Sequence, residues 1–574
     1  MSAAAASLVR LPVWRARFVL AALVAAFAVL AARSVYLQAV RTEFLQEKGE
    51  ARYSRVLEVP ATRGRILDRN GVALAISTPV QSVWAIPGDV DATPARLREL
   101  ARLLGADARE LRRRLADTSR DFVYLQRQIS PEVAGRVAQL GIAGVYQHRE
   151  YRRYYPGGEL TAHVIGFTDV DGLGREGVEL AFQDALGGAP GSRRVIKDRR
   201  GRVVEDIESI RAAQDGRDLQ LSIDGKIQSL AYGALKSAVL AHRARAGALV
   251  ALDVRTGEVL ALANAPSYNP NDRARRTGAQ LRNRAVTDVF EPGSTLKPFT
   301  VALALESGKV TPSTRVPIGS GGLRMASYTI RDMHPERVLT VAQVVQKSSN
   351  IGAARLALAL HRDDLWSLFH RVGFGAPPQL GFPGEAAGRL RPAESWRPIE
   401  QATMAYGHGI SLSLLQLARA YSLFARDGEL IPVTLVKSPV PAAGARVISP
   451  RVARQVRDML ELAVQPGGTA PRARIMGWRV AGKTGTAHKQ ENGGYAPDKY
   501  ISSFVGFAPA SEPRVIVAVM IDEPSDGQYY GGVVAAPVFA EVMRGALRVL
   551  GAPYDAPLEP VPLPGEGEEA REST

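Results

Sequence analysis

One apolar run near the N-terminus constrains this chain more than any other feature. Residues 18–32 read FVLAALVAAFAVLAA without a charge, and the apolar pattern resumes after Arg33 and reaches Val40. A helix of about 20 residues crosses the hydrocarbon core of a bilayer, and an arginine near its end can reach the headgroups. No later segment is long and apolar enough to span. We therefore expect one transmembrane helix at 18–40, with all later residues folding on one side of the membrane.

The charges around that run predict its orientation. Three arginines and no acidic residue precede it, and the first acidic residue of the chain is Glu43. Positive flanks stay on the cytoplasmic side of a membrane. Residues 1–17 are thus expected to be a cytoplasmic tail, with the later residues in the periplasm of a cell that has an inner membrane. A signal peptide cleaved near residues 31–33 is the alternative, and the apolar residues beyond Arg33 favour the uncleaved anchor.

The composition excludes several kinds of chemistry. The chain has no cysteine, which removes thiol catalysis, disulfides and thiolate-bound metals. Its eight histidines lack spacings such as HExxH, so no metal site is expected. The formal net charge of +16 favours anionic surroundings such as a membrane surface or an acidic polymer. No basic run is interleaved with aromatic residues, so nucleic-acid binding is not expected.

The order of strand and helix patterns predicts an α+β fold. Before residue 220, short strands alternate with helices rich in Arg and Leu, and Asn70-Gly71 between apolar runs predicts a hairpin. Beyond it, strands come first, helices occupy the middle and strands return before a last helix. This order predicts a central antiparallel sheet with an inserted helical subdomain.

The composition also changes at the C-terminal end, where the chain becomes rich in Pro, Gly and acidic residues. Such a segment cannot bury enough apolar surface to fold, so disorder is expected. The expected parts are a cytoplasmic tail at 1–17, a transmembrane helix at 18–40, a mixed pedestal domain at 41–220, a larger domain with the central sheet at 221–550 and a disordered acidic tail at 551–574.

A serine and a lysine stand three residues apart in the segment EPGSTLKPF. Pro292-Gly293 predicts a turn that can begin a helix, which would place Ser294 and Lys297 on one helix face. A serine becomes a nucleophile when a base takes its proton, and a neutral lysine amine can be that base. A capping serine beside a surface lysine is the alternative for this pattern alone.

Two further segments carry polar residues at comparable positions. KSSNIGAARLALAL places Ser348 and Asn350 at the start of a helical run, where a hydroxyl can relay a proton and an amide can hold a substrate carbonyl. An ordinary helix cap is the alternative. WRVAGKTGTAHK places four residues on a predicted strand, which can provide positive charge, close approach to the backbone, a carboxylate site and an oxyanion hole. These four residues are Lys483, Thr484, Gly485 and Thr486.

Together the three segments indicate serine acyl-transfer chemistry, because penicillin-binding proteins and class A β-lactamases carry this set in this order. The chain resembles a class B penicillin-binding protein from the membrane span to about residue 550. RGRILDRNG at 63–71 resembles the family's pedestal, and segments 251–272 and 291–300 resemble its division-specific branch, the FtsI type. Tyr-Gly-His-Gly at 406–409 occupies the place of a Tyr-Gly-x-Gly motif, with an unusual histidine.

The resemblance implies a serine-type D-Ala-D-Ala transpeptidase that needs no metal or organic cofactor. Ser294 would attack the penultimate D-Ala carbonyl of a donor stem peptide with help from Lys297. Ser348 and Lys483 would protonate the departing amine, and Asn350 would orient the donor amide. The remaining binding roles fall on the Lys-Thr-Gly-Thr strand: Lys483, Thr484 and Thr486 would hold the carboxylate that β-lactams mimic, and the N–H groups of Ser294 and Thr486 would form the oxyanion hole.

The resemblance also implies partners, and it leaves alternatives open. The expected partners are peptidoglycan stem peptides, β-lactam antibiotics, a septal glycan polymerase of the FtsW type and other divisome membrane proteins. The alternatives are an elongation-specific transpeptidase and a non-catalytic division scaffold that retains penicillin binding. A β-lactamase or a D,D-carboxypeptidase would not need a pedestal of this size, and a β-lactam sensor would bring further cytoplasmic or membrane domains.

Overall fold

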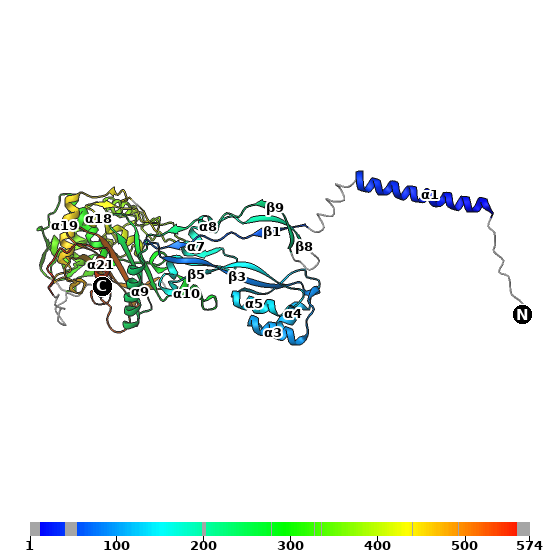
Figure 1. The fold of residues 1–574 in the computed structure, drawn as a ribbon. Coiled ribbons are helices and arrows are strands. Elements are labelled where there is room, and N and C mark those ends of the chain that lie inside the picture. The colour runs from blue at the N-terminus through cyan, green and yellow to red at the C-terminus, as the bar shows by residue number, and fades with distance from the viewer. Residues whose placement is uncertain are drawn as a thin grey trace, which may run out of the picture. The chain divides into compact units, whose positions relative to one another are not determined.

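The structure is a computed structural model of the 574-residue chain, and it describes residues 12–40, 54–197, 203–276, 278–325, 328–333, 336–438, 440–491 and 493–559. The N-terminal apolar run forms helix α1 (Val13–Val35), which continues into a π-helical turn (Tyr36–Val40). Among the described residues it is the one helix long and apolar enough to cross a membrane, and none of it is buried (Figure 1). It is consistent with single-pass membrane anchoring. The predicted cytoplasmic tail lies outside the described residues as far as residue 11.

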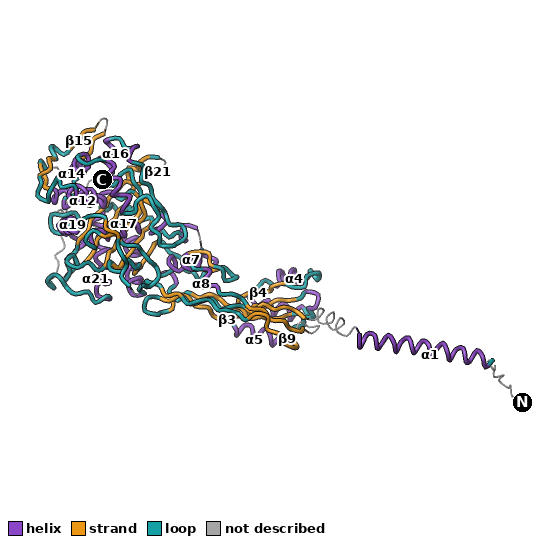
Figure 2. Tube along the Cα trace, turned by 90° about the horizontal axis from the view of Figure 1, so that it is seen from above, coloured by secondary structure: helices purple, strands orange, loops and turns teal. Residues whose placement is uncertain are grey.

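Beyond that helix, the described residues fall into two compact units. The first unit takes its residues from 54–61, 82–148 and 189–215. It holds a three-stranded antiparallel sheet of β1 (Ser54–Val59), β8 (Gly191–Lys197) and β9 (Val203–Arg211). Figure 2 shows strands in orange and helices in purple.

Three short helices of the first unit begin at side-chain caps. Thr93 caps α3 (Pro94–Leu104), Asp107 caps α4 (Ala108–Leu115) and Ser130 caps α5 (Pro131–Gln139). Each cap oxygen accepts a backbone N–H that the first helical turn would otherwise leave unpaired. The helices bury an apolar cluster together with strand β4 (Val123–Ile129). Among the described residues of this unit we identify no cluster of catalytic side chains, and the pedestal role stays a prediction.

The second unit takes its residues from 62–81, 149–188 and 216–559, and it is built on a five-stranded antiparallel sheet. The strands lie in the order β12 (Val259–Ala265), β11 (Ala246–Asp253), β23 (Val515–Asp522), β22 (Gly494–Ala508) and β21 (Ala481–Glu491). Every neighbouring pair is antiparallel. The α+β class with a central antiparallel sheet is therefore confirmed, and β21 is one of its two edge strands.

Alternation along the strands divides the core of this unit into two layers. Leu249 and Ala251 of β11 face one layer, which α9 (Gly225–Ala241) and α21 (Ala536–Val549) cover. Val250 and Leu252 face the other layer, where helices inserted between β12 and β21 pack. Strand side chains alternate between the two faces of a sheet. Because both faces are buried, the strand reads as a continuous apolar run.

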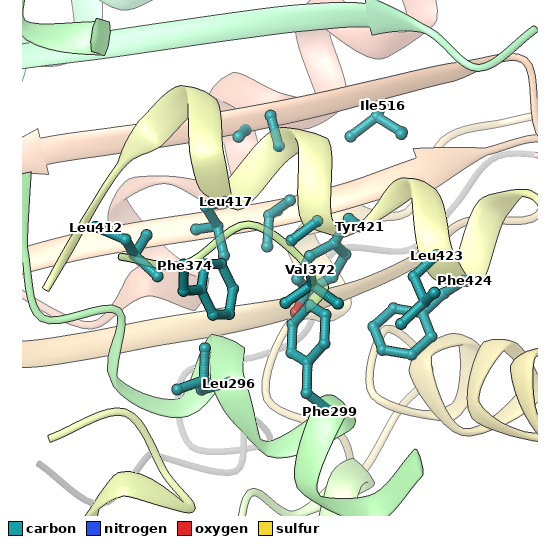
Figure 3. Packing of buried hydrophobic residues seen from close by; sticks show 14 of the residues in the cluster. Leu296, Phe299, Val372, Phe374, Leu412, Leu417, Tyr421, Leu423, Phe424 and Ile516 are labelled. Carbon is teal, nitrogen blue, oxygen red and sulfur yellow. The ribbon is translucent and has the colours of Figure 1, made fainter. Parts of the chain in front are cut away.

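The helical layer centres on Phe299, which lies in α12 (Lys297–Glu306). Its ring contacts Phe374, Tyr421 and Phe424, with centroids 5.7, 5.7 and 4.9 Å away. Figure 3 shows these rings, which come from separate segments, packed together above the start of α12, with Leu296 nearby. Buried aromatic pairs of this kind contribute beyond the area that they bury. The start of α12 is thus fixed by close packing on its inner face.

Residues 551–559 do not match the predicted disordered tail. The ring of Tyr554 packs at a tilt against that of Trp478 with centroids 4.5 Å apart, and the indole N–H of Trp478 donates to the carbonyl of Pro553 at 2.9 Å. Asp555 accepts hydrogen bonds from the backbone N–H of Arg479 and from Ser511. These contacts of one aromatic ring and one carboxylate hold the short stretch against the domain, although its composition is similar to that of a disordered segment. Residues 560–574 lie outside the described residues.

Three buried charged residues from separate segments of the second unit form a cluster of ion pairs. Arg63 and Arg153 each donate to a different carboxylate oxygen of Glu179, at 2.6 and 2.7 Å. The side chain of Glu179 is 0% exposed. One negative charge therefore balances two guanidinium groups away from water, and losing it would leave both without a carboxylate partner.

We predict that Glu179→Gln lowers the free energy of unfolding by about 3 to 5 kcal/mol, the usual cost of leaving a buried charge uncompensated. Thermal unfolding of the variant should show a clearly lower midpoint. Glu512→Gln is the matched control, because Glu512 pairs with Arg255 while 77% exposed, and exposed pairs contribute little. Equal midpoints for the two variants would contradict a structural role for the buried cluster.

Candidate active site

The predicted nucleophile lies in a buried turn directly before a helix. Ser294 belongs to a 3-10 turn (Gly293–Leu296), and α12 begins at Lys297. The hydroxyl of Tyr421 donates to the backbone carbonyl of Thr295 at 2.8 Å, so the aromatic core also holds this turn. Only 2% of Ser294 is exposed. The sequence placed Ser294 in the first helical turn, and the structure places it just outside.

Lys297 connects the first two predicted segments through its amine. The Nζ atom donates to the Oγ atom of Ser294 at 2.8 Å and to the Oγ atom of Ser348 at 2.9 Å, and also to the backbone carbonyl of Ser348. Lys297 is fully buried. The amine can therefore exchange a proton with either hydroxyl without moving.

The Ser-Ser-Asn segment is held by an aspartate that the motif does not contain. Ser348 has a left-handed backbone with φ of 61°, a conformation that costs a non-glycine residue of order 1 kcal/mol. Asp332 accepts hydrogen bonds from the Ser349 hydroxyl and from the backbone N–H groups of Asn350 and Ile351. The aspartate thus caps α14 (Asn350–Leu358) and offsets that cost.

Asn350 is only partly satisfied by the protein. Its amide nitrogen donates to the carbonyl of Arg331 at 3.3 Å. Its Oδ1 atom is buried and has no hydrogen-bond partner among the residues that the structure describes. A buried acceptor without a donor is costly, so this oxygen is suited to accept a hydrogen bond from a ligand.

The Lys-Thr-Gly-Thr segment lies on edge strand β21, against the nucleophile turn. A Cβ atom on Gly485 would lie 2.7 Å from the carbonyl oxygen of Pro292 and 3.0 Å from Thr295. Only a glycine lets the strand approach the turn this closely. The structure therefore brings the third predicted segment beside Ser294.

The polar side chains of this strand have protein partners of their own. Lys483 donates from Nζ to the hydroxyl of Thr484 at 3.0 Å, and Thr484 shares a hydrogen bond of 2.9 Å with Thr469. The hydroxyl of Thr486 accepts from the backbone N–H of Gly531 at 3.0 Å. These bonds fix the orientation of the ammonium and hydroxyl groups before any ligand arrives.

Glu291 ties the nucleophile turn to two neighbouring segments. Its carboxylate accepts hydrogen bonds from the N–H of Gly409 at 2.8 Å, from Gln490 at 2.7 Å and from the hydroxyl of Tyr495 at 2.9 Å. Burial raises the pKa of this carboxyl group. Burial also lowers the pKa of His408 to about 4. His408 is therefore neutral at pH 7.

Sequence reasoning missed several residues that border the site. Asp332, Thr469 and Glu291 act through hydrogen bonds to other segments of the chain, and no spacing in the sequence signals such bonds. The tyrosine pair before Gly531 could have indicated a segment that borders the site, because two adjacent aromatic residues follow an apolar strand there. Tyr529 stacks on Tyr500 with centroids 4.0 Å apart, and the Gly531 N–H binds Thr486.

The described residues contain no group of three or more His, Asp or Glu side chains placed to hold a metal ion.

Two family models match this chain, one in its N-terminal part and one in its C-terminal part. Residues 58–221 match the family model of the penicillin-binding protein dimerisation domain, and residues 247–544 match that of the penicillin-binding protein transpeptidase domain. A probable peptidoglycan D,D-transpeptidase PenA from Neisseria gonorrhoeae is 46% identical over 548 residues, which cover 95% of this chain and 94% of the relative.

Two further proteins are similar over most of their own length. Peptidoglycan D,D-transpeptidase FtsI from Escherichia coli K12 is 41% identical over 549 residues, which cover 95% of this chain and 93% of the relative. The solved apo transpeptidase domain of penicillin-binding protein 3 from Burkholderia pseudomallei is 50% identical, with a TM-score of 0.55. The match covers 59% of this chain and 98% of that domain.

We predict that Gly485→Ala slows acylation of the protein by benzylpenicillin at least about tenfold, because small displacements of a positioned group are costly in catalysis. The added methyl would meet the carbonyl of Pro292 and push β21 away from the nucleophile turn. Stopped-flow acylation kinetics measure the effect. Gly494→Ala is the control, since a Cβ atom there meets nothing within 4 Å. Wild-type acylation in Gly485→Ala would show that the close approach is not needed.

Proposed function

This chain belongs to the class B penicillin-binding proteins, and we propose that it uses Ser294 to cross-link peptidoglycan at the division septum. It is a peptidoglycan D,D-transpeptidase, as its relatives and its transpeptidase domain indicate. It acts on stem peptides and binds β-lactams. The proposal adds the residues that carry the reaction, the site of action in the cell and the partners.

The observation that carries the catalytic proposal is the position of the Lys297 amine between two serine hydroxyls. In acylation, neutral Lys297 takes the proton from Ser294 as its Oγ atom attacks the penultimate D-Ala carbonyl. The proton then passes through Ser348, with Lys483 assisting, to the amine of the departing D-Ala. General-base and general-acid help of this kind accelerates reactions by about 10² to 10⁴.

Donor binding is proposed to use the edge of the sheet. An edge strand has backbone groups without a neighbouring strand, and an extended peptide can pair with them. Lys483, Thr484 and Thr486 then hold the terminal carboxylate, with Gly485 keeping the backbone accessible. The free Oδ1 atom of Asn350 accepts the donor amide N–H.

The oxyanion hole is assigned to the N–H groups of Ser294 and Thr486. The tetrahedral intermediate places a negative oxygen between the nucleophile turn and β21, which approach closely at Gly485. Backbone N–H groups in a buried site stabilise such an oxygen strongly. A β-lactam enters the same position and leaves a long-lived acyl-enzyme.

The periplasmic orientation and the septal role rest on features outside the catalytic residues. The arginines before the membrane span support a cytoplasmic N-terminus. The similarity of segments 251–272 and 291–300 to the division-specific branch supports work at the septum. We propose that the membrane helix binds a glycan polymerase of the FtsW type, because its alanine-rich surface permits close helix packing. The pedestal would bind other divisome proteins.

We predict that mass spectrometry of penicillin-treated protein places the covalent adduct on the peptide that contains Ser294. Ser294→Ala should abolish the adduct without changing the unfolding midpoint, because the replacement removes only the nucleophilic oxygen. Ser349→Ala is the control, since that hydroxyl bonds Asp332 in a helix cap. An adduct that persists in Ser294→Ala would overturn the assignment.

We predict that depletion of this protein in its own host produces long cells without septa and with normal width. Cross-linking along the lateral wall would continue, so growth in length would not stop. Light microscopy of cells carrying a titratable copy of the gene measures the outcome. Rounded cells that still divide would place the enzyme in elongation, and normal growth with an intact wall would favour a non-catalytic scaffold.

A further inference from the structure

A cavity of 710 Å³ opens beside the Tyr-Gly-His-Gly turn, and the mechanism above does not use it. Its lining combines aromatic and apolar side chains with two guanidinium groups. The residues used below are Tyr328, Arg391, Arg397, Met404, His408 and Tyr495. A mixed lining of this kind suits a ligand with both apolar and charged parts.

One side of the cavity is connected to the nucleophile turn through the residue that precedes His408. Gly407, which precedes His408, accepts a hydrogen bond from the N–H of Gly293 at 3.3 Å. A Cβ atom on Gly407 would lie 2.1 Å from the Gly293 carbonyl oxygen, so the two backbones touch directly before Ser294. On the opposite wall, Tyr495 donates to Glu291 at 2.9 Å. A ligand in the cavity would therefore border the turn that carries the acyl group.

The two guanidinium groups share a single carboxylate. Glu400 pairs with Arg391 at 3.0 Å and with Arg397 at 3.4 Å. The backbone N–H of Arg397 and both guanidinium groups hold the pKa of Glu400 near 2, so it stays ionised. An arginine has five N–H donors, and Arg391 has no other ion pair among the described residues. The pair therefore keeps one net positive charge and several donors for a ligand.

The rest of the lining is neutral. His408 has no hydrogen bond from its ring nitrogens to a described residue, and its ring lies 6.0 Å from that of Tyr495. Tyr328 and Met404 supply apolar surface. The cavity thus combines one cationic wall with an aromatic wall that carries an unpaired imidazole edge.

We propose that this cavity binds the acceptor stem peptide, and that Arg391 and Arg397 bind a carboxylate close to its attacking amine. The inference rests on the proposed transpeptidase mechanism and adds the chemistry of its second substrate. The donor carboxylate is assigned to Lys483 and β21, so the arginine pair of the cavity is left for a second anionic substrate. Guanidinium groups bind carboxylates in a defined orientation, which would aim the neighbouring amine at the acyl carbon.

The transfer step balances without a further reactant. The neutral amine attacks the acyl carbon, a C–N bond forms, and the bond from that carbon to the Ser294 Oγ atom breaks. One amine proton ends on Ser294 through Lys297, which restores the free enzyme. The cavity residues stay outside this exchange and act as acceptor-binding and positioning groups.

The test is a partition experiment on the full-length protein in detergent. A thioester of an acylated D-alanine acylates Ser294, and D-alanine or D-alaninamide serves as the acceptor. The two acceptors differ only in whether a carboxylate lies next to the amine. Chromatography of the products gives the ratio of transfer to D-alanine over transfer to D-alaninamide. Fluorescent penicillin labelling of each variant checks folding and the donor half-reaction separately.

We predict that Arg391→Gln and Arg397→Gln each lower this ratio on the order of tenfold, the effect of one hydrogen bond to a charged group. Glu400→Gln should raise it, because the arginines lose their competing carboxylate while glutamine keeps the capping box of α16 (Pro398–Met404). Arg544→Gln, at an exposed position of α21, should leave it unchanged.

A ratio that stays at the wild-type value in both arginine variants would overturn the assignment. A ratio that falls in Glu400→Gln or in Arg544→Gln would overturn it as well. Absence of any acylation of the wild-type protein at Ser294 is a different result, because it would remove the proposed mechanism itself.

Discussion

The reactive part of this protein depends on one buried amine that two serine hydroxyls share. Lys297 reaches Ser294 at 2.8 Å and Ser348 at 2.9 Å from a fully buried position. The two serines come from segments 54 positions apart in the chain, so the contact exists only when the whole helical subdomain is folded. Burial keeps water away from this contact, so the two hydroxyl groups are the side-chain partners that the amine meets.

The surrounding structure holds this contact from three sides. Phe299 and Tyr421 fix the start of α12 and the turn before it from the apolar core. Asp332 holds the backbone after Ser348 through the cap of α14. Gly485 lets β21 lie against the turn, so that the Lys-Thr-Gly-Thr segment is placed by sheet packing rather than by a loop. Sites supported by packed elements are more precise than sites on loops.

Much of this arrangement could be predicted from the sequence, because local patterns carry it. The single apolar helix, the antiparallel sheet and the helical insertion follow from hydrophobic periodicity. The three motif segments were predicted to converge, and the structure brings them together. What the sequence could not reveal depends on hydrogen bonds between segments that are separate in the sequence, as with Asp332, Glu291 and Thr469. The ordered stretch at 551–559 escaped prediction for a similar reason. Its composition predicts disorder, but one ring contact with Trp478 and the hydrogen bonds of one carboxylate hold it in place.

The most direct test of this account is the rate of acylation by benzylpenicillin in Lys297→Arg. The guanidinium group keeps the positive charge and much of the bulk but does not give up its proton. The account predicts a fall of at least about a hundredfold, the contribution of a general base. Lys226→Arg, at an exposed position of α9, should react at the wild-type rate. Acylation of a folded Lys297→Arg protein at a rate close to wild type would contradict the account.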